Sequence, residues 1–122
     1  MTTFREAFPI LYVDDVATAA ELYRPTFGFE ETFRHEDEAG LPDFMFLTLE
    51  PLGIGIGRRP DDDEGRDFAL WIYTDDVDDA AERIRSTGAT EVLSPTAQPW
   101  GERICSYIDP NGHLIHVGSR QE

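Results

Sequence analysis

The strongest constraint on this sequence is that its second half repeats its first half at a constant spacing of 61 residues. The stretch YVDDVATAAELYRPTFGFEE, which begins at Tyr12, and the stretch YTDDVDDAAERIRSTGATEV, which begins at Tyr73, have ten identical positions. About one identity is expected by chance in a window of this length, given average amino-acid usage. The 122 residues therefore predict one domain, 1–122, made of two repeats of one supersecondary unit, about 1–61 and 62–122. The acidic run at 61–64 lies at their junction and is expected to be a solvated linker.

Both repeats show the same order of secondary-structure signals, which predicts an α+β fold of two βαβββ modules. A strand, at about 7–13 and 68–74, leads into Asp-Asp, where a side-chain oxygen can cap the first turn of a helix. The helices are predicted at about 15–26 and 76–87, each with an apolar stripe and a following glycine. Three strands follow each helix, at about 29–35, 43–50 and 53–58 and at about 90–94, 102–109 and 113–118. Each helix can cover only one face of its sheet, which leaves the other face to be explained.

Alternation along the predicted strands divides their side chains into an aliphatic set and a largely aromatic set. In the strand at about 102–109, for example, Ile104 and Ile108 oppose Tyr107. Aliphatic residues suit dense packing against a helix, so the aromatic set, with its few polar groups, is predicted to line a ligand pocket on the other face. With a tryptophan from a neighbouring loop, the predicted ligand-binding residues are Phe8, Tyr12, Phe44, Phe46, Trp71, Tyr73, Trp100, Arg103, Tyr107 and His116. A second core or a dimer interface is the alternative, because both also use large aromatic side chains.

Glycines near the predicted pocket indicate that a bulky group approaches closely. Gly53, Gly55 and Gly57 alternate in the stretch GIGIG, which leaves one face of that strand bare. Trp100 and Gly101 place an indole on a loop with little beside it, and this arrangement suits stacking on a flat ligand. We therefore expect Trp100 at the pocket rim rather than in the core.

The charge of the chain is strongly negative. It contains 25 acidic residues, 10 arginines and no lysine, which gives a formal net charge of -15. Such a chain is repelled by phosphate backbones, so we expect no nucleic-acid partner. The acidity has two interpretations, attraction of cationic ligands or a solvated surface typical of an acid-rich proteome.

Cysteine usage and hydropathy predict a cytoplasmic protein without a membrane partner. The single cysteine, Cys105, excludes an internal disulfide and fits a reducing compartment. The apolar runs are too short to cross a bilayer, and no basic segment followed by an apolar stretch marks an export signal.

The duplicated unit, the opening VDDVATAAELYRPTFGFE and the closing PWGERICSYIDPNGHLIHV together resemble the vicinal oxygen chelate superfamily. This superfamily includes glyoxalase I, extradiol dioxygenases, fosfomycin-resistance proteins and bleomycin-resistance proteins. The most specific motifs are Asp15 at the helix start with Tyr23 eight residues later, and DPNG before the last strand. The resemblance implies sheets curved around a cleft, and modules that pair across a homodimer.

Enzymes of this family bind a divalent metal through His or Glu on the first strand of each module and Glu on the last strands. The resemblance places the first-strand ligands at Phe8 and Ala69, which cannot bind metal, and the stretch GIGIGRR lacks a donor as well. Only His116 remains, where the family usually has Glu, and a stable site needs three or more protein ligands. We therefore expect no metal and no cofactor, unless His113, His35 or a partner chain supplies donors. His116 is interpreted as a hydrogen-bonding pocket residue.

What remains resembles the metal-free branch, the bleomycin-resistance proteins, whose homodimers sequester a bulky, cationic, planar-ringed antibiotic between subunits. The implied function is metal-independent, antibiotic-resistance-like binding of a planar or cationic aromatic small molecule, without catalytic residues. One alternative is a metal-independent enzyme in which His116 or Tyr107 is the acid or base beside Cys105 and Arg103. Another is a glyoxalase-like lyase or isomerase, or a dioxygenase, with substituted metal ligands.

Overall fold

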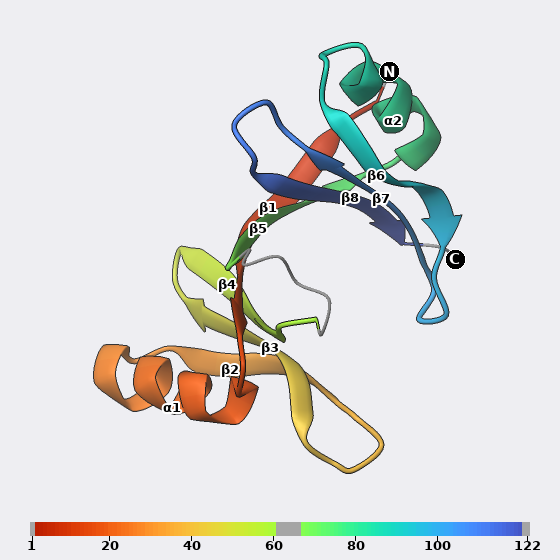
Figure 1. Ribbon diagram of the computed structural model, residues 1–122. Coiled ribbons are helices and arrows are strands. Elements are labelled where there is room, and N and C mark those ends of the chain that lie inside the picture. Colours follow the sequence, from red (N-terminus) through yellow and green to blue (C-terminus); the bar gives the residue numbers. More distant parts are fainter. Residues whose placement is uncertain (1, 61–66, 121–122) are drawn as a thin grey trace. The chain divides into compact units, whose positions relative to one another are not determined.

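Each half of the duplicated sequence forms its own βαβββ unit in the computed structural model, which describes residues 2–60 and 67–120 (Figure 1). The N-terminal unit comprises residues 8–68, and the C-terminal unit comprises residues 69–122 together with the first seven residues of the chain. The predicted acidic linker at 61–64 lies outside the described residues. Within the described ranges, no helix is long and apolar enough to cross a membrane.

The N-terminal unit is a four-stranded sheet with one helix. Its elements are β1 (Phe4–Val13), of which the residues from Phe8 onward belong to this unit, α1 (Val16–Phe27), β2 (Glu30–Glu36), β3 (Pro42–Leu49) and β4 (Leu52–Arg58). The strands lie in the order β2-β3-β4-β1, with β1 parallel to β4 and the other pairs antiparallel.

The C-terminal unit repeats this plan. Its elements are β5 (Phe68–Thr74), α2 (Val77–Arg85), β6 (Thr90–Ala97), β7 (Glu102–Ile108) and β8 (Leu114–Arg120). The strands lie in the order β5-β8-β7-β6, with β5 parallel to β8. The predicted α+β class, with two βαβββ modules, is confirmed.

Both helices start at the second aspartate of the repeated Asp-Asp pair. Asp15 accepts a hydrogen bond from the backbone N–H of Thr18, and Asp76 accepts one from that of Asp79, each at 3.1 Å. These contacts satisfy N–H groups that the helix itself leaves unpaired. α1 ends as expected at Gly28, whose φ of 87° is left-handed. α2 ends at Arg85, two residues before its predicted end.

Each helix buries its small apolar stripe against one face of its own sheet. In the N-terminal unit, Val16 and Ala20 of α1 pack with Met45, Leu47 and other aliphatic residues of the sheet. Alternation predicts that Met45, Leu47 and Leu49 face the helix; this is confirmed for Met45 and Leu47, whereas Leu49 is 43% exposed. In the C-terminal unit, the buried residues around α2 are Val77, Ala80, Ala81, Cys105, Tyr107 and Val117. We call the opposite face of each sheet its helix-distal face.

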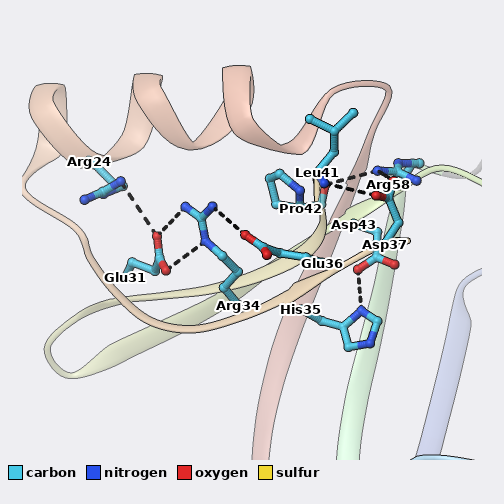
Figure 2. Close-up of polar contacts among 10 residues, drawn as sticks. All are labelled: Arg24, Glu31, Arg34, His35, Glu36, Asp37, Leu41, Pro42, Asp43 and Arg58. Carbon is cyan, nitrogen blue, oxygen red and sulfur yellow. Dashed lines mark hydrogen bonds and ion pairs between the residues drawn. The ribbon is translucent and has the colours of Figure 1, made fainter. Parts of the chain in front are cut away.

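The edge strand β2 carries charged side chains that pair with one another and with α1. Arg34 donates to Glu31 at 2.9 Å and to Glu36 at 3.4 Å, and Arg24 of α1 lies 3.8 Å from Glu31 (Figure 2). Figure 2 also shows Arg58 of β4 donating to Asp37 beyond the end of β2. Charges along an edge strand disfavour pairing with the strands of other molecules.

Candidate functional site

The helix-distal face of the N-terminal unit is covered by aromatic rings of the chain itself. The rings of Phe8 and Phe46 meet edge to face with centroids 4.9 Å apart. A Cβ atom on Gly53 would overlap the Phe46 ring, and one on Gly55 would lie 2.8 Å from Cζ of Phe44. The glycines of GIGIG thus make room for these rings, and the Tyr12 ring lies over the next glycine, Gly57. The expectation that they make room for a ligand ring is wrong.

The helix-distal face of the C-terminal unit brings three predicted residues together. Trp71 and Tyr73 lie on β5, and their ring centroids are 5.8 Å apart. The His116 ring on β8 lies 5.4 Å from the Trp71 ring, because Trp71 and His116 are register partners in the parallel pair. The Trp71 ring also covers Gly118, where an added Cβ would lie 3.0 Å from the indole.

A carboxylate that the sequence analysis missed, Glu102, joins two of the aromatic residues. The Tyr73 hydroxyl donates to one Glu102 oxygen and the Trp100 indole N–H donates to the other, each at 2.6 Å. Burial and the hydrogen bond to Glu102 raise the pKa of Tyr73 to about 12, so the phenol stays a donor at neutral pH. Trp100 itself is 59% exposed. Glu102 could have been found from its position at the first residue of β7, directly after the PWG motif.

Arg120, the register partner of Glu102 in the β7–β8 pair, also contacts Tyr73. Its guanidinium carbon is 4.0 Å from the centroid of the Tyr73 ring, and it donates to Glu6 at 2.9 Å. Glu6 has a φ of 54°, which makes it the one non-glycine residue with a left-handed backbone in the part of the chain that the structure describes. These contacts link five side chains, which we call the Tyr73 cluster: Glu6, Arg120, Tyr73, Glu102 and Trp100.

His116 is held as a neutral imidazole. Its Nδ1 lies 2.7 Å from the Ser106 hydroxyl. Burial lowers the pKa of His116 to about 4, so at neutral pH the ring is uncharged and can accept from Ser106. This contact fits the hydrogen-bonding role expected for His116.

Two predicted pocket residues, Arg103 and Tyr107, lie on the wrong face. Arg103 donates to Asp78 of α2 at 2.9 Å and 3.0 Å, and Tyr107 is fully buried in the helix-packed core, where its hydroxyl donates to Glu91. The reason is the β7–β8 register, which pairs Tyr107 with Ile115. Directly paired residues of antiparallel strands point to the same face, so Tyr107 follows Ile115 to α2.

The same register separates the groups proposed for a metal-independent enzyme. Cys105 and Arg103 lie on the α2 side of β7, whereas Ser106 and His116 lie on the helix-distal face. Burial also raises the pKa of the Cys105 thiol to about 11, which leaves it protonated and unreactive at neutral pH. An acid or base at His116 therefore does not act beside Cys105 and Arg103.

The residues at the family's metal-ligand positions do not fit a metal ion. The Phe8 ring packs on Phe46 and Ala69 is fully buried, and neither side chain has a donor atom, so His116 is the one donor among these positions. Among the residues that the structure describes, no group of three or more His, Cys, Asp or Glu side chains could hold a metal.

A family model covers most of the chain. Residues 6–117 match the family model described as "Glyoxalase/Bleomycin resistance protein/Dioxygenase superfamily". An uncharacterized protein of Mycobacterium tuberculosis is 27% identical over 121 residues, which cover 90% of this chain and 71% of that protein.

Solved structures show the same fold at low identity. A glyoxalase/bleomycin resistance protein/dioxygenase superfamily member from Vibrio splendidus is 18% identical, with a TM-score of 0.73 over 96% of this chain and 99% of that chain. Methylmalonyl-CoA epimerase from Mycobacterium tuberculosis is 20% identical, with a TM-score of 0.70 over 94% of this chain and 87% of that chain.

Proposed function

Because this chain belongs to the glyoxalase/bleomycin resistance protein/dioxygenase superfamily, we propose that it binds a planar, cationic aromatic small molecule without the help of a metal ion. The binding surface is the helix-distal face of the C-terminal unit, with Trp71, Tyr73, Trp100 and Glu102. The observation that carries the proposal is the position of the Glu102 carboxylate, which accepts hydrogen bonds from the Tyr73 hydroxyl and the Trp100 indole N–H.

The chemistry of Glu102 favours a cation as the ligand. Both hydrogen bonds to this carboxylate come from neutral donors, and the cation beside it is Arg120, its register partner on β8. An ionised carboxylate accepts about four hydrogen bonds, so acceptor capacity remains for an N–H group of a ligand. The faces of the neighbouring rings offer stacking and cation–π contacts to a flat, positively charged molecule.

The charge of the whole chain supports the same ligand class. Most of the arginines that the structure describes lie within 4.0 Å of a carboxylate: Arg5, Arg24, Arg34, Arg58, Arg59, Arg85, Arg103 and Arg120. With 25 acidic residues against 10 arginines, many carboxylates have no arginine to neutralise them. Such a surface raises the local concentration of cations, and salt screens the effect.

The pairing of His116 with Ser106 favours a second function, an isomerase or lyase of the same fold. A neutral imidazole on the same face as the Tyr73 phenol is the kind of acid–base pair that such reactions use. Its weakness is the pKa of His116, about 4, which makes the ring a poor base at neutral pH. Conversion of a bound compound into a product would favour this function over sequestration.

The proposed function is tested by titrating the protein with proflavine, a planar cationic dye, and with fluorescein, a planar anion, as the matched control. Wild-type protein should bind proflavine saturably, more weakly at high salt, and should not bind fluorescein. Trp100→Ala should weaken proflavine binding by roughly 1–3 kcal/mol, because the loss of a stacking residue removes contact area and a partner of Glu102. Its thermal unfolding should stay nearly unchanged, because the indole is largely exposed. Equal binding of both dyes, or no effect of Trp100→Ala on affinity, would rule the proposal out.

A further inference from the structure

We propose that Arg120 is a built-in cation that occupies the ligand's position over Tyr73 and must leave when a ligand binds. This inference rests on the proposed function and deepens it, because the group already in place indicates which cations the site accepts: planar ones with delocalised charge.

The contacts of Arg120 are those that a bound cation would make. Its guanidinium carbon lies 4.0 Å from the centroid of the Tyr73 ring, inside the range of a cation–π contact. Its two terminal nitrogens lie 2.9 Å and 3.4 Å from the two oxygens of Glu6. One face of the guanidinium is thus covered by a ring, and one edge is bound by a carboxylate.

The Tyr73 ring is held in place independently of a ligand, and Glu6 pairs with a second arginine, Arg5, at 3.5 Å. The Tyr73 hydroxyl donates to Glu102 at 2.6 Å, which fixes the ring over which the guanidinium lies. Glu6 has a left-handed backbone with a φ of 54°, a conformation that costs free energy for a side chain with a Cβ. The residue with this backbone is the one whose carboxylate binds Arg120.

The guanidinium of Arg120 can leave this position, because its ion pair with Glu6 is exposed on both sides. The side chain of Arg120, the last residue of β8, is 54% exposed, and that of Glu6 is 49% exposed. Exposed ion pairs and cation–π contacts are weak, so another cation can replace the guanidinium at a small cost.

The replacing ligand would meet the face of Tyr73 and the carboxylate of Glu6, which Arg120 contacts, and the carboxylate of Glu102, the register partner of Arg120. A flat cation with its charge spread over several N–H groups matches a ring face flanked by carboxylates, as the guanidinium itself does. The structure therefore points to amidinium, guanidinium or aminoacridine-type cations rather than to compact ammonium ions.

The test compares proflavine binding to wild-type protein, to Arg120→Gln and to a matched control, Arg34→Gln. Arg34 lies in the other unit, on β2, and is ion-paired on the surface, so both variants change the net charge equally. Arg120→Gln should bind proflavine about tenfold more tightly, because an ion pair and a cation–π contact no longer compete. Arg34→Gln should bind like wild-type protein. Adding Tyr73→Leu to Arg120→Gln should remove the gain, and circular dichroism should confirm that each variant is folded.

Each other outcome rejects the inference. If wild-type protein binds proflavine saturably and both single variants match it, Arg120 does not compete, while the proposed function stands. The same conclusion follows if both variants gain equally, because net charge then explains the effect. Weaker binding by Arg120→Gln would show that Arg120 contacts the ligand instead of leaving. If no variant binds proflavine, the proposed function fails and the inference fails with it.

Discussion

His116, on the helix-distal face of the C-terminal unit, shows how burial sets the protonation state of a single residue. Its imidazole is neutral, accepts from or donates to Ser106 at 2.7 Å, and lies against the Trp71 ring. Burial is what lowers its pKa from 6.5 to about 4. The same burial that makes His116 a poor general base therefore makes it a source of acid sensitivity.

The unfolding free energy should fall as pH is lowered from 6.5 to 4, because the unfolded chain binds a proton at His116 in this range and the native chain does not. The loss is complete below about pH 4, where both states are protonated, and it amounts to about 3 kcal/mol for a pKa change of this size. Denaturant unfolding of His116→Gln should therefore show a shallower decline between these pH values than wild-type protein shows. The same measurement on His113→Gln controls for the loss of an exposed histidine. Identical declines for wild-type protein and His116→Gln would contradict the buried neutral imidazole.

At the scale of elements, strand pairing decides what the helix-distal faces contain. In the N-terminal unit, β4 supplies no side chains of its own at Gly53, Gly55 and Gly57, and rings from β3 and β1 fill the space above it. A strand with alternating glycines is stable here because aromatic rings from the neighbouring strands cover the backbone at the glycines and bury apolar area in place of β4 side chains.

Gly55→Ala should destabilise the fold by roughly 1–3 kcal/mol, because overpacking a filled space forces neighbours to shift. The added methyl would lie 2.8 Å from Phe44 and 3.2 Å from the buried Ile10. Chemical denaturation of Gly55→Ala, of Phe44→Leu and of the double variant measures the effect. The double variant should be more stable than the sum of the two changes predicts, because the smaller side chain relieves the contact. Strict additivity would mean that the methyl does not meet the ring.

For the whole molecule, we expect a homodimer. Aromatic residues gather on the helix-distal faces, and several large hydrophobic side chains are strongly exposed, Phe33 at 55% and Trp100 at 59% among them. A partner chain that covers such side chains removes apolar area from water, and this burial favours association. Light scattering at micromolar concentration should give twice the 13.8 kDa chain mass, and a stable species of 13.8 kDa would contradict the expectation.

We also expect the whole molecule to work without a bound metal. Phe8 and Ala69 stand where the family's enzymes have ligands, and neither has a donor atom in its side chain. Protein purified without chelator should contain far less than one equivalent of Zn, Ni, Mn or Fe by elemental analysis. About one metal per chain, whose removal unfolds the protein, would overturn this expectation.

Much of the fold could be predicted from the sequence alone, because its signals are local. The repeat at a spacing of 61 predicted two equal modules, and the Asp-Asp pairs predicted both helix starts, which the capping bonds of Asp15 and Asp76 confirm. Alternation also separated the two faces of strands such as β3 and β7. These signals depend on residues close together in the chain, so no knowledge of the tertiary structure was needed.

Only the tertiary structure decided which face of β7 meets the helix. The same contact decided which side chains of β7 join the candidate site of the C-terminal unit. Alternation divides the side chains of a strand into two sets but does not say which set packs against the helix. In β7 the isoleucines Ile104 and Ile108 suggested the wrong set. The hairpin register places Tyr107 opposite Ile115 and so in the core, and it brings Ser106 to His116 and Glu102 to the outer face. Contacts such as those of Glu102 with Tyr73, or Arg120 with Glu6, join residues 29 and 114 positions apart. Separations of that length leave no trace in local periodicity, because strand pairing alone brings such residues together.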